Sequence, residues 1–164
     1  MNGERLARHF GVCAMSTSKV RRDGVAPLVM THLRGETSPE MPTELRVSEA
    51  AFSIVVQLRS LQHHDLRLGG RVTHSGTVPA GAVSAVSLTD LPRSRMRGHF
   101  DALQFYVPEV FLRDFANEEG FVSPAHLSWP RAQPDSIALA ITELLVPAIG
   151  RHDTAASLFV DHLV

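Results

Sequence analysis

The spacing of the apolar residues changes at Pro108, and this change constrains the fold of the 164-residue chain more than any other feature. Before Pro108 the chain has stretches with a period of two, such as residues 52–58 (FSIVVQL), where every second residue from Phe52 is large and apolar. After Pro108 the apolar residues recur at helical spacing. The sequence therefore predicts an α+β protein with its strands first and its helices last.

Short strands joined by glycine and proline turns are predicted in the first part. The predicted strands are residues 26–34, 52–58, 64–68, 71–74, 83–88 and 102–107. Gly69 and Gly70 separate two of them, and both central residues of a primed hairpin turn need positive φ. Strands at a spacing of about ten residues with such turns favour a barrel or sandwich over βαβ units.

Three helices are predicted in the second part. The first begins at Pro108, whose missing N–H costs nothing there, and ends before Gly120. Asp135 is a good N-cap for the second helix, which Pro147 must end or kink. The third carries residues 157–164 (SLFVDHLV) to the last position of the sequence.

These patterns divide the chain into three parts within one domain. Residues 1–25 are weakly patterned and are expected to form a weakly ordered N-terminal segment. Residues 26–107 are expected to form the barrel. Residues 108–164 are expected to form a helical segment. The length is ordinary for a single domain with its own hydrophobic core.

The composition argues against several classes of protein. With 16 Lys and Arg against 17 Asp and Glu, the chain has no basic excess for binding DNA by itself. Its nearest approach to a basic stripe is Arg93, Arg95 and Arg97, which we interpret as a solvated edge strand whose charges discourage further pairing. The lone Cys13 excludes an internal disulfide. Since no signal peptide or membrane-spanning stretch is evident, we expect a cytoplasmic protein without a membrane partner.

The residues give no positive sign of catalysis or of a bound metal. His63 and His64 are adjacent, so a strand would place them on opposite sides, and the sequence has no His-x-His motif. No Gly-x-Ser-x-Gly motif is present, and Gly69-Gly70 lacks the lysine and helix of a phosphate-binding loop. We therefore expect no catalytic residue, no metal ligand and no cofactor.

The inside of a small barrel can hold a small molecule. Polar side chains on the predicted strands are the candidates for lining it: His32, Gln57, His74 and Tyr106. Each has an alternative. Gln57 could lie on the outer face, His32 and Tyr106 could be hydrogen-bonded within the core, and His74 could be exposed.

Several of these segments, in this order, resemble the N-terminal sensor domain of AraC-family transcription regulators. Residues 100–108 (FDALQFYVP) lead into an amphipathic helix that ends at Glu119-Gly120, as in many such proteins. Further matches follow the same order at residues 55–58 (VVQL), 66–71 (LRLGGR), 78–81 (VPAG), 87–91 (SLTDL), 134–135 (PD) and 158–163 (LFVDHL). The resemblance extends over residues 26–164.

The resemblance implies a cupin-like β-barrel of the jelly-roll type, followed by helices that mediate dimerisation. The implied function is sensing: an unknown small-molecule effector binds in the barrel, and its occupancy is relayed to a helix-turn-helix domain expected beyond residue 164. DNA would be bound only through that domain. A homodimer is expected, and its candidate contacts are Leu158, Phe159, His162 and Leu163. The same apolar stripe could instead pack on the barrel.

Two other classes stay open on the sequence. One is a cupin-type enzyme with an unusual metal site, and the other is a stand-alone dimeric interaction module. A stripe of Ile137, Ile141 and Leu144 on the second helix offers further apolar surface, which we expect to cover the barrel or to pack on the last helix.

Overall fold

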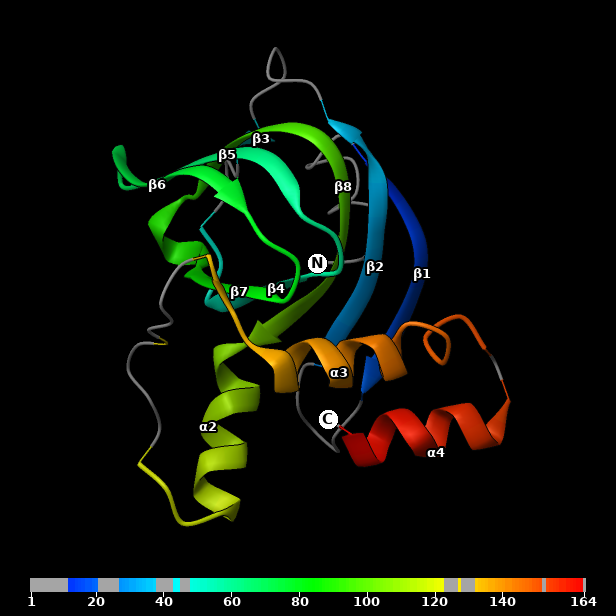
Figure 1. Ribbon diagram of the computed structural model, residues 1–164. Helices are drawn as coiled ribbons and strands as arrows, with labels where there is room; N and C mark the ends of the chain where they lie inside the picture. Colours follow the sequence, from blue (N-terminus) through cyan, green and yellow to red (C-terminus); the bar gives the residue numbers. More distant parts are fainter. Residues whose placement is uncertain are drawn as a thin grey trace.

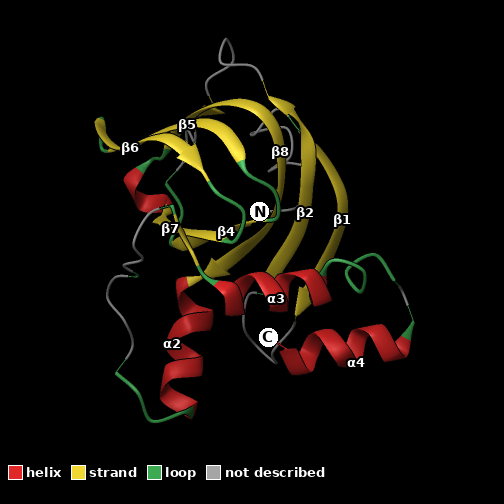
Figure 2. Cartoon of the chain, in the orientation of Figure 1, coloured by secondary structure: helices red, strands yellow, loops and turns green. Residues whose placement is uncertain are grey.

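The computed structural model describes residues 12–20, 27–37, 43–44, 48–122, 127, 132–151 and 153–163 (Figure 1). Its strands are β1 (Cys13–Val20), β2 (Leu28–Thr37), β3 (Thr43–Glu44), β4 (Ala51–Gln57), β5 (Leu61–Leu68), β6 (Arg71–Val78), β7 (Ala82–Ser87), β8 (Arg93–Pro108) and β9 (Gln133–Pro134). Its helices are the short η1 (Leu88–Asp90) and the three longer α2 (Glu109–Glu118), α3 (Ser136–Leu145) and α4 (Thr154–Leu163). Figure 2 shows the strands curling above these three helices.

The 16-residue strand β8 is shared by the two parts of the sheet. Its first part, residues 93–97, pairs with β5, and its second part pairs with β2 on one side and β4 on the other. Gly98 lies between the two parts with φ +100°, a backbone conformation that favours glycine. This residue allows one strand to bend from one wall of the fold into the next.

All strand pairs are antiparallel, and the described strands do not close into a ring. The order is β1-β2-β8-β4-β7-β9, while β5 and β3 flank the first part of β8 and β6 pairs with β5. Within the described residues β6 pairs only with β5, and β1 only with β2. The prediction of a β-rich first part followed by helices is confirmed, and the sheet is consistent with a cupin-like barrel that stays open.

Register separates the main sheet into two faces. Leu103, paired with His32 and Val56, points to the face that the helices cover, which we call the outer face. Gln104, paired with Thr31 and Val55, points the opposite way, to the inner face. The inner face packs on β5 and β6 in a cluster of Leu33, Leu61, Val78, Ala82, Met96, Phe100 and Ala102.

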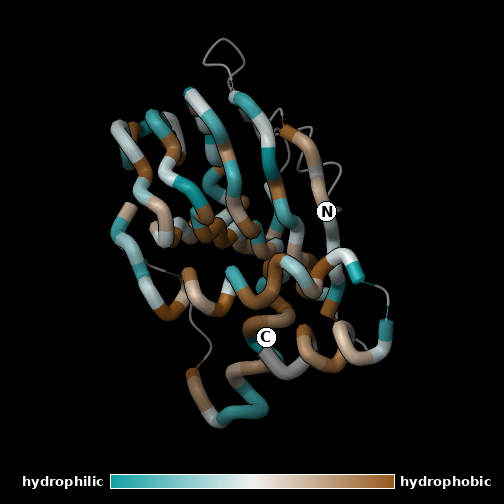
Figure 3. Tube along the Cα trace, turned by 45° about the vertical axis from the view of Figure 1, so that its right-hand side comes forward, coloured by the Kyte–Doolittle hydropathy of each residue, from teal (hydrophilic) through white to brown (hydrophobic). Residues whose placement is uncertain are grey.

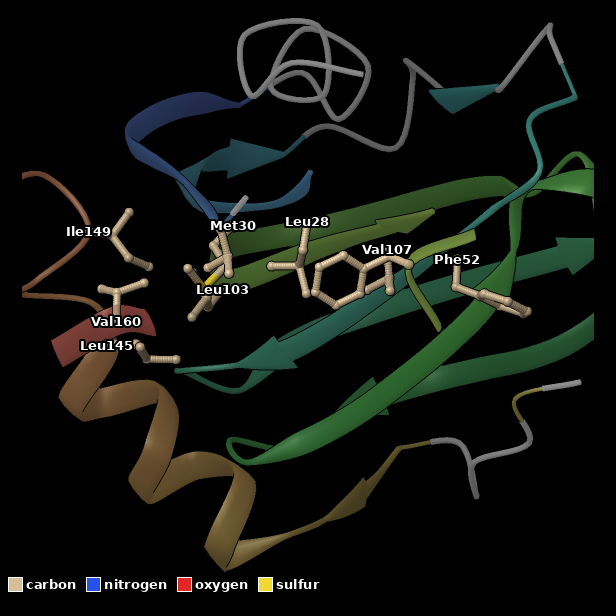
Figure 4. Packing of buried hydrophobic residues seen from close by; sticks show 10 residues of the cluster. Leu28, Met30, Phe52, Leu103, Val107, Leu145, Ile149 and Val160 are labelled. Carbon is tan, nitrogen blue, oxygen red and sulfur yellow. The ribbon is translucent and has the colours of Figure 1, made fainter. Parts of the chain in front are cut away.

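The outer face carries the larger hydrophobic cluster. Figure 4 shows Leu145, Ile149 and Val160 from the helical segment directed at Met30 and Leu103 of the sheet. The hydropathy colouring of Figure 3 shows apolar stretches gathered where the lower half of the sheet meets the helices. The helices are therefore held to the sheet by burial of apolar surface on one side of β2 and β8.

The predicted turn and helix signals are confirmed, except that α2 begins at Glu109 and Pro108 is its N-cap residue. Gly69 and Gly70 have φ +53° and +81°, as the hairpin between β5 and β6 requires. The carboxylate of Asp135 accepts hydrogen bonds from two first-turn amides of α3, both at 2.9 Å. Gly120 has φ +71° just after α2, and α3 ends at Leu145, before Pro147.

Two features of the strands differ from the sequence analysis. Strand β1 (Cys13–Val20) lies inside the segment 1–25 that was expected to be weakly ordered, since CAMSTSKV has no period-two pattern of large apolar residues. Strand β8 begins already at Arg93, which pairs with Arg67 of β5 and with Glu44 of β3. Arg93 therefore has a partner strand on each side, whereas Arg95 and Arg97 pair only with β5 within the described residues, and all three arginine side chains are exposed. The edge-strand interpretation fits Arg95 and Arg97 and was wrong for Arg93.

Truncation of Leu103 tests the role of the outer cluster. Leu103 is fully buried between the sheet and the helices, so Leu103→Ala leaves a cavity and should lower the free energy of unfolding by about 2–5 kcal/mol. Urea unfolding measures this change. The control is Val72→Ala, at a side chain that is 54% exposed and should change stability by less than about 0.5 kcal/mol. Equal effects of the two substitutions would contradict the assignment of the core.

Candidate functional site

The inner face of β2, β8 and β4 carries a group of polar side chains. Antiparallel pairing places directly opposite residues on the same face, so the cross-strand rows can be read from the register. The three rows are Val29–Tyr106–Ser53, Thr31–Gln104–Val55 and Leu33–Ala102–Gln57. Polar and small apolar groups thus alternate over one wall of the curled sheet.

Four of these polar residues are buried, and three of them keep an unpaired atom. Thr31 and Gln104 are 0% exposed, Gln57 is 4% exposed and Ser53 is 5% exposed. The Gln104 amide Nε2 donates to Ser53 Oγ at 2.8 Å. Among the described residues Thr31 Oγ1, Gln57 Oε1 and Gln104 Oε1 have no hydrogen-bond partner. An unpaired buried polar atom costs about 1–3 kcal/mol, and native proteins contain few of them.

Tyr106 lies on the same wall, in the row with Val29 and Ser53. Its hydroxyl donates to Glu49 Oε2 at 3.0 Å. Burial, and then the hydrogen bond to Glu49 and the charge of that carboxylate, raise the pKa of Tyr106 to about 12. The phenol is therefore neutral at physiological pH, and its proton is directed at the carboxylate.

The second wall, formed by β5, β6 and the first part of β8, adds two imidazoles. His64 pairs with Met96 of the inner cluster, and its Nε2 lies 3.1 Å from Ser94 Oγ. The His74 ring centroid lies 5.9 Å from that of His64, and His74 Nε2 is buried without a hydrogen-bond partner among the described residues. His63 points the other way, with its Nε2 3.0 Å from Asp65 Oδ1, so the two adjacent histidines lie on opposite faces as predicted.

His32 lies apart from this group. It is on the outer face, where its Nε2 is 2.8 Å from Asp101 Oδ1. Asp101 Oδ2 is also 3.6 Å from the Nε atoms of both Arg34 and Arg59. This ion-paired cluster gives His32 a structural partner, in line with the hydrogen-bonded alternative stated for it.

The structure thus brings three of the four predicted ligand residues to the inner face. Gln57 and Tyr106 share the first wall, and His74 lies on the second. Sequence analysis missed the partners of this group, of which Thr31, Ser53, Ser94 and Gln104 are buried and His64 is half-buried. The alternation in residues 102–107 already indicated that Gln104 shares a face with Tyr106, because the two are two residues apart on one strand. Only the pairing of β2 with β8 shows that Thr31 lies beside Gln104.

In the part of the chain that the structure describes, no group of three or more His, Cys, Asp or Glu side chains has an arrangement that could hold a metal ion. No helix among the described residues is long and apolar enough to cross a membrane.

The helical segment presents apolar side chains to solvent. On α4, Ala156 and Val160 are buried, whereas Leu158 and Phe159 are 54% and 42% exposed. The side chains of His162 and Leu163 lie outside the described residues. The stripe Ile137, Ile141 and Leu144 of α3 does not cover the sheet as expected, because all three side chains are exposed. Leu145, one residue further along α3, is the fully buried contact instead.

Comparisons with known proteins give structural similarities only. No protein-family model and no curated relative matches the sequence. The fold is similar to a Cupin 2 conserved barrel domain protein from Salinispora arenicola, with 11% identity over 62% of this chain and 82% of the other, at a TM-score of 0.40. It is also similar to the AraC-like transcriptional activator CuxR, with 16% identity over 88% and 53% of the two chains and a TM-score of 0.38. Ectoine synthase from P. lautus has 14% identity over 75% and 88% of the two chains and a TM-score of 0.37.

The pKa of Tyr106 can be tested directly, because Tyr106 is the only tyrosine of the chain. We expect its phenolate absorbance near 295 nm to rise with a midpoint at about pH 12. Glu49→Gln removes the carboxylate charge and should lower this midpoint, while burial keeps it above the ordinary value of 10.0. Since the folded-state pKa is the higher one, the stabilisation from Tyr106 is present below pH 10 and is lost as the pH rises through 12. A midpoint at 10 in both proteins would contradict the buried, paired phenol.

Proposed function

We propose that this chain is the effector-sensing and dimerisation domain of an AraC-type transcription regulator, and that its inner face binds a small molecule. The observation that carries the proposal is the set of buried atoms without partners on one wall: Thr31 Oγ1, Gln57 Oε1 and Gln104 Oε1. A core that served only to stabilise the fold would favour apolar residues at these positions. A ligand that hydrogen-bonds these atoms would offset their cost.

The composition of the wall supports binding of a small molecule. Binding sites are concave and mostly apolar, with a few polar groups that fix the orientation of the ligand. Here Val55 and Ala102 lie beside the polar residues on the same face. His74, on the second wall, offers a further buried polar atom.

A relay to the helices is available through β8. Gln104 belongs to the inner face, and its neighbour Leu103 belongs to the outer cluster with Leu145 and Val160. A ligand that displaces β8 or stiffens it changes the surface on which α3 and α4 pack. The shift between two helix arrangements is limited by the difference in the ligand's binding free energy for the two arrangements.

Dimerisation through the helical segment completes the proposal. Leu158 and Phe159 of α4, with Ile137 and Leu144 of α3, are exposed apolar residues on a segment that is otherwise anchored to the sheet. A second copy of the chain would cover them. DNA would be bound by a helix-turn-helix domain following α4 in a longer chain, as the AraC resemblance implies.

A thermal-shift screen tests the sensing function. The set should include sugars, amino acids, nucleotides, aromatic acids, fatty acids and divalent metal salts. We expect one class of organic compound to raise the melting temperature by about 5–10 °C at 100 times its Kd, because such binding adds about 2.7 kcal/mol. No stabilisation by any compound would favour a stand-alone interaction module. Stabilisation by a metal ion alone, reversed by EDTA, would favour a cupin-type enzyme.

The dimer is tested by placing a charge on α4. Leu158→Asp should shift a dimer towards monomer by at least tenfold in dissociation constant, since a carboxylate cannot be buried in an apolar contact without cost. Sedimentation equilibrium measures the shift. Val72→Asp is the matched control, because Val72 is equally exposed, at 54%, but lies on β6. A wild-type monomer at high concentration, or equal effects of both variants, would count against this interface.

A further inference from the structure

The three unpaired atoms of the inner wall belong to residues at neighbouring positions of β2, β8 and β4. We call Thr31 Oγ1, Gln57 Oε1 and Gln104 Oε1 the acceptor patch. Thr31 pairs directly with Gln104, and Gln57 pairs with Ala102, which makes Gln57 the diagonal neighbour of Gln104. Direct neighbours have Cβ atoms about 4.5–5.5 Å apart, and diagonal neighbours are about 7–8 Å apart.

The atoms of the patch determine which hydrogen bonds a ligand must supply. The amide oxygens of Gln57 and Gln104 accept hydrogen bonds and cannot donate them, while the Thr31 hydroxyl can do either. Gln104 Nε2 donates to Ser53 Oγ, and in this orientation of the amide its oxygen is unpaired. A partner for the patch therefore needs at least two donor groups.

The charges around the patch disfavour an anion. A carboxylate, that of Glu49, accepts the hydrogen bond of Tyr106, which is two residues along β8 from Gln104. The basic residues of β2, β5 and β8 alternate onto the outer faces: Arg34, Arg67, Arg93, Arg95 and Arg97. Arg71, at the tip of the hairpin, and Lys19, on β1, are exposed. An anion bound at the patch would lose its water with no described cation on that wall to replace it.

We infer that the ligand of the inner face is an uncharged molecule that donates two or more hydrogen bonds, from hydroxyl or amide groups, to Gln57 Oε1 and Gln104 Oε1. This inference rests on the proposed function and adds the chemical class of the effector. The Thr31 hydroxyl forms a third bond, and Val55 and Ala102 contact the apolar part of the molecule.

Matched sets of compounds test the class of ligand. Each set has a neutral, an anionic and a cationic member on one skeleton, such as sorbitol, gluconate and glucamine, or nicotinamide, nicotinate and 3-(aminomethyl)pyridine. We expect neutral members to raise the melting temperature of the full chain by about 5 °C or more near saturation, and the charged members of the same set to have little effect.

Gln57→Met assigns any such effect to the patch, because methionine has nearly the same shape and no amide oxygen. We expect this variant to weaken binding of a stabilising neutral compound about tenfold, as loss of one hydrogen bond predicts. The melting temperature of unliganded Gln57→Met should rise, since an unpaired buried acceptor has been removed. Gln62→Met is the control, because Gln62 is exposed on β5.

Each remaining outcome overturns the inference in a distinguishable way. Stabilisation by an anionic or cationic member that Gln57→Met abolishes overturns the ligand class and leaves the proposed binding function intact. No stabilisation by any set overturns the ligand class, and the broader screen and the dimer measurement then decide on the proposed function. A lower melting temperature of unliganded Gln57→Met shows that the Gln57 oxygen is already satisfied, which removes the basis of the patch.

Discussion

The sharing of β8 between two walls is the constraint on which the rest of the structure depends. One strand of 16 residues pairs with β5 over its first part and with β2 and β4 over its second part, and it bends at Gly98. Without the bend, the inner faces of the two walls could not enclose Leu33, Met96 and Phe100 in one cluster. The inner face exists as an interior because this strand changes direction within the sheet.

The alternation of side chains along the same strand gives its two faces different roles. Leu103 and Val107 hold the helices by burial of apolar surface. Gln104 and Tyr106, on the other side, are polar and buried or half-buried. The outer face therefore stabilises the fold, while the inner face carries unpaired polar atoms that reduce stability when nothing binds them. Such a trade between stability and function is common at binding sites.

The fold was predictable from local signals wherever those signals were strong. Gly69-Gly70, Asp135 and Gly120 each require a particular backbone geometry or offer a particular hydrogen bond, and each predicted the observed turn or helix end. Strand β1 was missed because its side chains are mostly small and polar, and its pairing with β2 comes from tertiary structure. The arginines of β8 gave a local signal for an edge, which fits Arg95 and Arg97 but not Arg93, since the partners of a strand come from distant parts of the chain.

The candidate site was predictable in residue type, whereas the faces on which its residues lie were predictable only in part. Alternation placed Gln57 opposite the apolar stripe of its strand, and that face is the inner one. The same reasoning could not exclude His32, because both faces of β2 are buried, one by the helices and one by the second wall. A period of two says which residues share a face, but only the sheet register says which face is enclosed.

In the proposed sensor, coupling between the two faces would follow from the rigidity of a paired strand. Satisfying two acceptors that cost about 1–3 kcal/mol each when unpaired makes available a few kcal/mol of binding free energy at Gln57 and Gln104. A difference of about 1.4 kcal/mol between two helix arrangements already changes their ratio tenfold. Because Leu103 and Gln104 are consecutive residues of β8, a ligand that moves the backbone to improve its contact with Gln104 also moves a contact of α3 and α4. Under the proposed function, a part of the ligand's binding free energy would therefore be sufficient to bias the helical surface that carries Leu158 and Phe159.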